Sequence, residues 1–217
     1  MKNNILIIAA NPDDAELGMG GTISKLSKNN NITLCILCKG NKPGKEFVEK
    51  ERMKALNKNI KTLGIKKLYL NTFSDVSLDT IPHIKITSYL NNIIKKVKPQ
   101  IVFTNRENDI HIDHSTLSKA VKVCCRPRHD NPVKALYEFP IPGSTEWSFK
   151  NTKYNTFIDI TNHSNKKYKC IKRYKTEINK SPDPLNIDFI KYRDYYFGSI
   201  SGNKKAEPFI CIFKKDV

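Results

Sequence analysis

The 217-residue sequence has few acidic residues and no long apolar run, and both absences restrict its function. It holds 21 Asp and Glu against 38 Lys and Arg, which gives a formal net charge of +17. No apolar run approaches the ~18 residues that cross a bilayer, so we expect no membrane span. The amino-terminal apolar run also lacks the small-residue cleavage pattern of a secretory signal, and we therefore expect a cytoplasmic protein.

The length favours one folding unit. At about 100–200 residues per domain, a chain of 217 residues can bury one sizeable core. No internal repeat and no long linker interrupts the sequence. We therefore interpret residues 1–217 as a single domain.

The six cysteines form no pattern that is typical of disulfides or zinc. Cys35 and Cys38 have the spacing of a zinc knuckle, but they belong to the apolar run Ile32–Cys38. Residues three apart on a strand point to opposite faces, so these two thiols should not meet on one metal. The other four are in a helical pattern or isolated. Reduced cysteines in the core are our interpretation.

The positive charge fits several kinds of partner: nucleic acid, an anionic membrane or a phosphorylated substrate. The lysines are scattered, and only residues 166–175 are dense. On a helix, Tyr168, Ile171 and Tyr174 would share one side and the charges would lie opposite. No nucleic-acid-binding motif or aromatic stacking pattern accompanies them. We interpret this segment as a solvated face, expect no nucleic-acid partner, and leave attraction to an anionic substrate open.

Apolar runs and helix-length patterns alternate along the chain. Strands are expected at Ile5–Ala10, Ile32–Cys38, Lys67–Asn71, Gln100–Thr104, Val133–Phe139, Thr156–Ile160 and Pro208–Phe213. Helices are expected at Gly20–Lys28, Phe47–Leu63, Ile84–Val97 and Ser115–Cys124. This alternation predicts an α/β fold, a Rossmann-like three-layer α/β/α sandwich with a mostly parallel sheet.

The first expected strand, Ile5–Ala10, leads into two adjacent carboxylates, Asp13 and Asp14. Ligands of α/β sheets bind at the carboxyl edge of the strands. The glycines at 18–21 differ from a dinucleotide fingerprint, and two carboxylates would repel a pyrophosphate. In a metal site one carboxylate can bind the ion while its neighbour transfers protons. The alternative is that one of them caps the following helix.

The segment 108–114 follows the strand expected at 100–104 and carries two of the five histidines, His111 and His114, with Asp113 between them. Neutral imidazole is a common zinc ligand, and a neighbouring carboxylate can orient its ring. Because both motifs follow strands at one edge of a parallel sheet, we expect them to meet in one pocket.

These motifs resemble those of the PIG-L/LmbE-like zinc-dependent deacetylases, which remove acetyl groups from N-acetyl amino sugars. The family's first signature, Ala-His-Pro-Asp-Asp-Glu-x-x-Gly-x-Gly-Gly-Thr, is similar to residues 10–22. Further similarities, in the family's order, are Arg52, Val-Phe-Thr at 102–104, Asp-Ile-His-Ile-Asp-His at 109–114 and Ser-Thr-Glu-Trp at 144–147. The resemblance therefore spans most of the chain.

The resemblance implies that Asp14 and His114 are metal ligands and that Asp13 is the general base. His111 would polarise the carbonyl or, when protonated, stabilise the oxyanion, with Asp113 as its neighbour or as the group that orients His114. The implied cofactor is Zn²⁺ or another divalent metal, and the implied substrate is an N-acetyl amino sugar. The charge adds a nucleotide- or phosphate-linked sugar as an option. Zinc lowers the pKa of bound water from about 15.7 to about 7, which suits this division of roles.

Arg52 and the region of Asp75 are candidates for binding sugar hydroxyls or a phosphate. A surface or helix-capping role serves equally well for each. The family also has an arginine at the position of Arg52.

Asn11 stands where the family has its first metal-ligating histidine. An amide oxygen is a harder and weaker zinc donor than imidazole. Three outcomes stay open: Asn11 ligates through oxygen and accepts a harder metal, another histidine such as His129 takes the position, or tight metal binding and activity are lost. The leading hypothesis is a metal-dependent N-deacetylase. The alternative is a catalytically impaired, metal-poor protein that acts as a carbohydrate-binding or scaffold domain.

Overall fold

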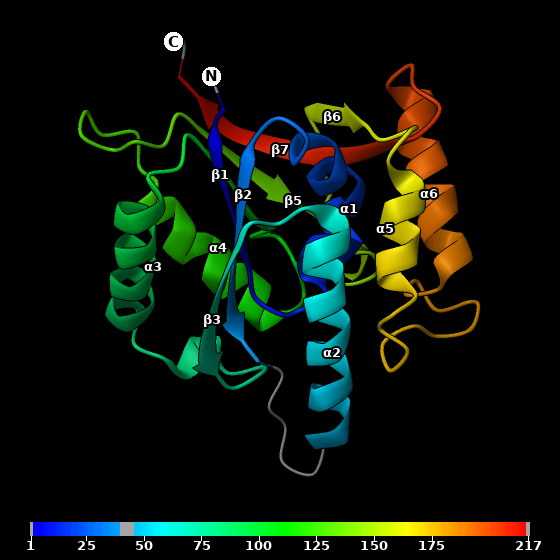
Figure 1. Cartoon of the computed structure of the whole chain (residues 1–217), viewed down its shortest axis with the longest axis horizontal. Helices are drawn as coiled ribbons and strands as arrows, with labels where there is room; N and C mark the ends of the chain where they lie inside the picture. The colour runs from blue at the N-terminus through cyan, green and yellow to red at the C-terminus, as the bar shows by residue number, and fades with distance from the viewer. Residues whose placement is uncertain (1, 40–45, 216–217) are drawn as a thin grey trace.

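The sheet is seven-stranded and mostly parallel in the computed structural model, which describes residues 2–39 and 46–215 (Figure 1). The strands are β1 (Asn4–Ala9), β2 (Asn31–Cys38), β3 (Lys67–Phe73), β4 (Ile101–Asn105), β5 (Ala135–Phe139), β6 (Thr156–Asp159) and β7 (Ala206–Lys214). Their order is β3-β2-β1-β4-β5-β7-β6. The first five strands in that order are parallel, β7 runs antiparallel to β5, and β6 runs antiparallel to β7.

Helices cover both faces of the sheet. They are α1 (Asp14–Leu26), α2 (Glu46–Leu63), α3 (His83–Val97), α4 (Ile112–Cys124), α5 (Ser164–Ile171) and α6 (Ile187–Ile200), with short 3₁₀ turns η1 (Leu78–Thr80) and η2 (Glu146–Ser148). Residues of α1, α2, α5 and α6 pack in one apolar layer, and those of α3 and α4 pack in the other. The predicted three-layer α/β/α fold is confirmed.

Strand β1 contributes side chains to the apolar clusters on both faces of the sheet. Ile5 and Ile7 belong to one apolar cluster, and Leu6 and Ile8 belong to the other. All four side chains are fully buried. A strand that is buried on both faces needs an unbroken apolar run, and the sequence has one at this place.

Each expected strand is present within two residues at both ends, but helix α1 begins at Asp14, six residues before the expected Gly20. The glycines of this helix allow close packing on neighbouring elements. A Cβ on Gly18 would meet Phe139 at 2.4 Å, and one on Gly21 would meet Ile160 at 2.8 Å. The glycine-rich segment is therefore a helix packed tightly on the sheet rather than a phosphate loop.

All six cysteines are free thiols, as predicted. The prediction that Cys35 and Cys38 point to opposite faces was wrong, because both pack in the same apolar cluster. The pairing of β2 with β3 shifts register between Ile36 and Cys38, which changes the alternation at the end of the strand.

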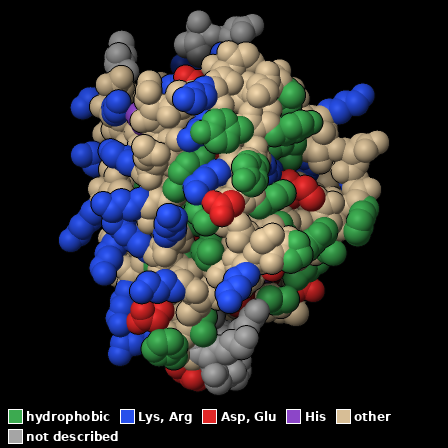
Figure 2. Space-filling model, turned by 90° about the vertical axis from the view of Figure 1, so that its right-hand side faces the viewer, with side chains coloured by type: hydrophobic (Ala, Val, Ile, Leu, Met, Phe, Trp, Pro, Cys, Tyr) green, Lys and Arg blue, Asp and Glu red, His purple; other side chains and the backbone are tan. Residues whose placement is uncertain are grey.

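The lysine-rich segment 166–175 places its apolar side as predicted: Tyr168, Ile171 and Tyr174 are buried. Lys and Arg side chains gather along one side of the face shown in Figure 2. Lys167 is the exception, because it is fully buried with its Nζ 2.8 Å from Asp194 and 2.9 Å from Glu207. Among the described helices, none combines the length and apolar character that crossing a bilayer requires.

Candidate active site at the carboxyl edge of the sheet

A cavity of about 370 Å³ lies where β1 and β4 end. Its lining includes Asn11, Asp13 and Asp14, which follow β1, and His111 and His114, which follow β4. Because neighbouring parallel strands end at the same edge, two motifs separated by about a hundred residues meet here.

The separation of Asp14 and His114 would allow them to bind one metal ion. The Asp14 Oδ1 lies 3.3 Å from the His114 Nε2. Two donors of one tetrahedral zinc, each at about 2.0–2.2 Å, lie about 3.3–3.6 Å apart. The other oxygen of Asp14 accepts hydrogen bonds from the Asn11 backbone N–H at 2.8 Å and the Asn105 amide at 3.0 Å, which fixes the carboxylate.

Asn11 offers a third donor. Its amide nitrogen donates to Asp75 at 2.6 Å. Its Oδ1 is buried and has no hydrogen-bond partner among the described residues. An unsatisfied buried acceptor costs about 1–3 kcal/mol, and a cation would satisfy it. A ligand set of Asn11, Asp14 and His114 would consist of two oxygens and one nitrogen, which would suit a divalent ion harder than zinc at least as well as zinc itself.

His129 does not supply the missing imidazole. It lies in the segment before β5, at the amino edge of the sheet, whereas Asn11 follows the carboxyl end of β1. The groove beside it, about 440 Å³ and lined by Arg126, Arg128 and parts of α3 and α4, is separate from the site. The suggestion that His129 replaces the first ligand was therefore wrong.

Asp109 orients His114, a role that the sequence analysis did not give to it. Its Oδ1 lies 3.2 Å from the His114 Nδ1. Its Oδ2 accepts hydrogen bonds from the hydroxyls of Ser144 at 3.0 Å and Thr145 at 2.7 Å. A carboxylate in the same segment as the imidazole was the available signal, but its contacts with residues 144 and 145 depend on the fold.

Asp113 holds a loop. Its carboxylate accepts the backbone N–H groups of Val76, Ser77 and Leu78 at 2.7, 3.0 and 2.9 Å. Its own backbone N–H donates to the His111 Nδ1 at 3.3 Å. Of the two positions predicted for Asp113, beside His111 or behind His114, the structure shows the first.

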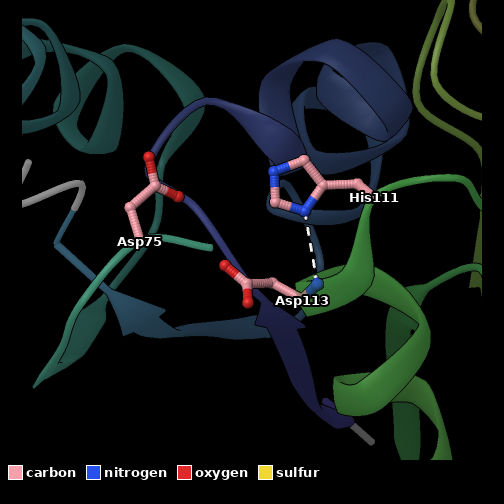
Figure 3. Close-up of side chains that lie close together, drawn as sticks. All are labelled: Asp75, His111 and Asp113. Atoms are coloured by element: carbon pink, nitrogen blue, oxygen red, sulfur yellow. Dashed lines mark hydrogen bonds between the residues drawn. The ribbon is translucent and has the colours of Figure 1, made fainter. Parts of the chain in front are cut away.

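Asp75, His111 and Asp113 form a second group of potential ligands (Figure 3). One potential ligand atom from each of these three side chains lies within 4.8 Å of the other two. The Asp113 oxygens already accept three backbone N–H groups. The group is a candidate metal site, although Asp113 has fewer lone pairs left for a cation than Asp14 has.

His111 stacks on His114 with ring centroids 4.4 Å apart. Because its Nδ1 accepts the backbone N–H of Asp113, the ring proton of a neutral His111 lies on Nε2. His111 also lines the cavity. It therefore offers an N–H donor next to the candidate metal ligands.

Arg52 is paired with Asp13. Its Nη2 donates to Asp13 at 3.1 Å, and its guanidinium lies 3.9 Å from Asp75 and 3.7 Å from Glu177. Burial raises the pKa of Asp13, and the charge of Arg52 opposes this rise. Arg52 lines the cavity with its guanidinium already held by carboxylates.

The metal-free site holds a proton on His114. Burial alone would lower the pKa of His114, but Asp14 and Asp109 raise it to about 10. Burial likewise opposes ionisation of Asp14, yet the charge and hydrogen bonds of His114 bring the pKa of that carboxyl below its ordinary value. A metal that binds through the Nε2 of His114 must displace this proton.

Fold and site together define a Rossmann-like α/β protein with a candidate metal centre of carboxylates and histidines at the sheet edge. A family model described as GlcNAc-PI de-N-acetylase (PIG-L) matches residues 6–125, which is more than half of the sequence. The chain belongs to the PIG-L family, and the resemblance seen in the sequence is confirmed.

Individual relatives are distant. The chain is 22% identical over 218 residues to the diacetylchitobiose deacetylase of Thermococcus kodakarensis, covering 94% of this chain and 80% of that protein. Its structure is similar to the N,N'-diacetylchitobiose deacetylase of Pyrococcus horikoshii, with a TM-score of 0.75 and 22% identity over 96% of this chain and 83% of the other. It is also similar to GalB, the 4-carboxy-2-hydroxymuconate hydratase of Pseudomonas putida, with a TM-score of 0.71 and 18% identity over 100% and 98% of the two chains. At such identities the structural likeness shows the fold and not the reaction.

Proposed function

We propose that this protein is a metal-dependent hydrolase that removes the acetyl group from an N-acetylated amino sugar or sugar conjugate. The observation that carries the proposal is the 3.3 Å separation of Asp14 Oδ1 and His114 Nε2 on a cavity that Asp13 also lines. Membership of the PIG-L family supports it.

Asn11, Asp14 and His114 would hold the ion. A divalent ion bound there supplies the Lewis acid that lowers the pKa of water and polarises a carbonyl. The unpartnered Oδ1 of Asn11 supports this ligand set over the neighbouring group of Asp75, His111 and Asp113.

Asp13 is the proposed general base. It takes a proton from the attacking water while the water oxygen bonds to the acetyl carbon. It then gives this proton to the sugar nitrogen as the C–N bond breaks, so the products are acetate and a free amine. The hydrogen bond from Arg52 holds the Asp13 carboxylate in one orientation during both transfers.

His111 is the proposed donor to the carbonyl oxygen. Its Nδ1 accepts from the Asp113 backbone, so its Nε2–H is the ring's donor. A preorganised donor aimed at the developing oxyanion typically contributes about 10²–10³-fold to turnover. In this proposal, Arg52 contacts the substrate less directly than the resemblance suggested, because it is paired with Asp13.

The test is amine release. The purified protein is incubated with N-acetylglucosamine or diacetylchitobiose and with Zn²⁺, Mn²⁺ or Co²⁺ in turn, and free amine is measured. We expect release with at least one metal and a loss of about 10²–10⁴-fold in Asp13→Asn, which should still bind the metal. No amine with any metal contradicts the proposal.

Asn11 favours a second candidate, a metal-poor carbohydrate-binding or scaffold protein. An amide in place of imidazole weakens zinc binding, and the carbohydrate cavity would then remain without the reaction. Binding of N-acetylglucosamine to metal-free protein, together with no amine release under any metal, would support this candidate.

A further inference from the structure

The outer side of helix α6 carries exposed apolar and aromatic side chains. Four of them recur at intervals of three and four residues, which places them on one line along the helix. We call them the aromatic stripe: Phe189, Tyr192, Tyr196 and Ile200. Tyr192 is 70% exposed and Tyr196 is 61% exposed. Exposed apolar residues that gather in this way mark an interaction surface.

The opposite side of α6 is also apolar, and the core covers it. Ile190 and Phe197 are buried there. A helix that is apolar all round is normally buried on every side. In the chain by itself the aromatic stripe faces solvent, so the composition of α6 indicates a partner that covers its outer side.

A row of exposed lysines runs beside this helix, on α5 and just after its last residue. The lysine row is Lys166, Lys169 and Lys172. Helices α5 and α6 lie side by side on the right of Figure 1. Lys205 contacts both, with its Nζ 5.1 Å from the ring centre of Tyr168 and 4.7 Å from that of Tyr195. On the face that these helices form, basic side chains gather along one side and hydrophobic side chains lie beside them (Figure 2).

We propose that the aromatic stripe and the lysine row dock the protein on the surface of a bilayer that contains anionic phospholipid. Tyrosine rings favour the headgroup level of a bilayer, and lysine side chains extend from there to the lipid phosphates. The inference goes beyond the proposed function and is independent of it, because no residue of α6 lines the candidate active site.

The acidic side chains near the stripe are already paired. On α6, Asp188 accepts from Lys191 at 2.8 Å. This hydrogen bond holds the pKa of Asp188 below its ordinary value, and the charge of Lys172 adds to the effect. Glu146 of η2, which contacts α6, accepts from Arg193 at 3.1 Å. The positive charge of the lysine row is therefore available to lipid phosphates.

Other partners fit this face less well. Lysine is depleted in the cores of protein interfaces, and the net charge of +17 opposes contact with a second copy. Single-stranded nucleic acid binds where aromatic rings line a basic groove, whereas neither of the two cavities described above is lined by a residue of α6. A bilayer is broad enough to contact the aromatic stripe and the lysine row together.

Buried contacts hold α6 in place beneath the stripe. Asp194 lies 2.8 Å from the Nζ of Lys167 on α5. A Cβ on Gly198 would meet the Lys204 carbonyl oxygen at 2.6 Å, so the backbone of α6 packs closely on the segment before β7. Docking therefore requires little ordering of the helix.

The test is vesicle sedimentation with the full chain. Vesicles of phosphatidylcholine alone are compared with vesicles that also contain phosphatidylglycerol. We expect at least ~10-fold tighter binding to the anionic vesicles, and this advantage should shrink as salt is raised. Equal binding to both kinds of vesicle, or binding to neither, would overturn the proposal.

Two variants test the apolar and the charged part of the surface separately. The double variant Tyr192→Ser with Tyr196→Ser should bind anionic vesicles about 10-fold more weakly. Its control is Ile84→Ser, 71% exposed on α3 across the sheet, which should bind like the wild type. Lys169→Glu should also weaken binding at least ~10-fold, because it reverses a charge at the bilayer surface. Lys95→Glu, exposed on α3, makes the same change in net charge and should have little effect.

Urea unfolding checks that each variant is folded. If the tyrosine double variant or the Lys169 variant binds anionic vesicles like the wild type, the proposal is wrong. A dimer in light scattering or a gel shift of RNA that the double variant abolishes would also overturn it, because the stripe would then serve another partner. Amine release from N-acetylglucosamine should be the same in the double variant and the wild type, so vesicle binding and the proposed function fail separately.

Discussion

The side-chain nitrogen of Asn11 lies 2.6 Å from a carboxylate oxygen of Asp75 and donates a hydrogen bond to it. A carboxylate only accepts, so this contact determines which end of the amide faces Asp75. The other end, Oδ1, is left buried without a hydrogen-bond partner among the described residues. Asp75 therefore orients Asn11 so that its side-chain oxygen is available to bind a metal ion at the place where the family has an imidazole.

Asn11→His should tighten zinc binding. Imidazole is a stronger zinc ligand than an amide oxygen, and a neutral histidine carries no more charge than the asparagine that it replaces. We expect at least ~10-fold higher zinc affinity and a smaller gain for Mn²⁺, measured by competition with a chromogenic chelator. Asn11→Ala, which removes the donor, should bind both ions more weakly than the wild type.

Asp75→Asn tests whether the orientation of Asn11 matters for metal binding. It keeps the size of the side chain at position 75 and removes the carboxylate that accepts the hydrogen bond from Asn11. We expect weaker metal binding with unchanged folding. If the wild type already binds zinc as tightly as the histidine variant, Asn11 is not the weak point of the site.

Metal binding should strengthen as pH rises. The pKa of His114 is raised to about 10 by Asp14 and Asp109 against the opposing effect of burial, so the ring is protonated at neutral pH. Binding through Nε2 must release that proton, which makes affinity rise about tenfold per pH unit below that pKa. Calorimetry at pH 6–8 in buffers of different ionisation enthalpy measures the released proton.

Asp109→Asn should reduce this pH dependence within the same window. It removes one of the two carboxylates that hold the proton on His114 while an amide can still contact its Nδ1. If metal binding to the wild type does not depend on pH, His114 releases no proton when the metal binds.

Glu16 is buried beside the site with an acid proton. Its Oε1 lies 2.8 Å from the Tyr174 hydroxyl and 3.0 Å from the Asn59 amide nitrogen. The single hydroxyl proton of Tyr174 also has the Pro12 carbonyl as an acceptor at 2.7 Å. A protonated Glu16 lets both bonds form, since it donates to Tyr174 while Tyr174 donates to Pro12. Burial raises the pKa of Glu16 to about 8, against the opposing effect of the hydrogen bonds to Tyr174 and Asn59.

Glu16→Gln should therefore stabilise the protein at neutral pH and not at acidic pH. The unfolded pKa is 4.5 and the folded pKa is about 8, so between these values only the folded state holds the proton. Wild-type stability from this group is complete below pH 4.5 and falls by about 1.4 kcal/mol per pH unit across the window. Urea unfolding at pH 5 and pH 7.5 compares the two proteins, and a constant difference between them would contradict the raised pKa.

The sequence predicted the parts of the site that depend on strand order. The apolar runs before Asn11 and before Asn108 are buried neighbouring strands, so their carboxyl ends had to meet. Helix α1 begins six residues before the expected Gly20, and the close packing of Gly18 against Phe139 in this first part of the helix cannot be read from the sequence. The contact of Asp109 with Thr145 joins segments 36 residues apart and follows from no periodicity.

The burial of Lys167 was not predicted, for a related reason. It belongs to a dense lysine run, where each lysine taken alone reads as exposed. Its partners Asp194 and Glu207 come from α6 and β7, and only the packed structure brings them to α5. Glu207 also accepts the backbone N–H groups of Gly21 and Thr22, at 3.0 and 2.7 Å, so the ion cluster supports helix α1 past its kink at Met19.

Lys167→Met should destabilise the fold strongly, whereas Lys166→Met, one residue away and exposed, should not. Removing the ammonium leaves two carboxylates buried without their cation, a loss that typically costs about 3–5 kcal/mol. An exposed lysine contributes within about 0.5 kcal/mol. Burial already raises the pKa of Asp194, so protonation at pH 5 should relieve part of the cost in the Lys167 variant and none in the control. Urea unfolding of both variants at pH 7.5 and pH 5 tests this, and equal stability of the two at pH 7.5 would show that the buried cluster does not depend on its lysine.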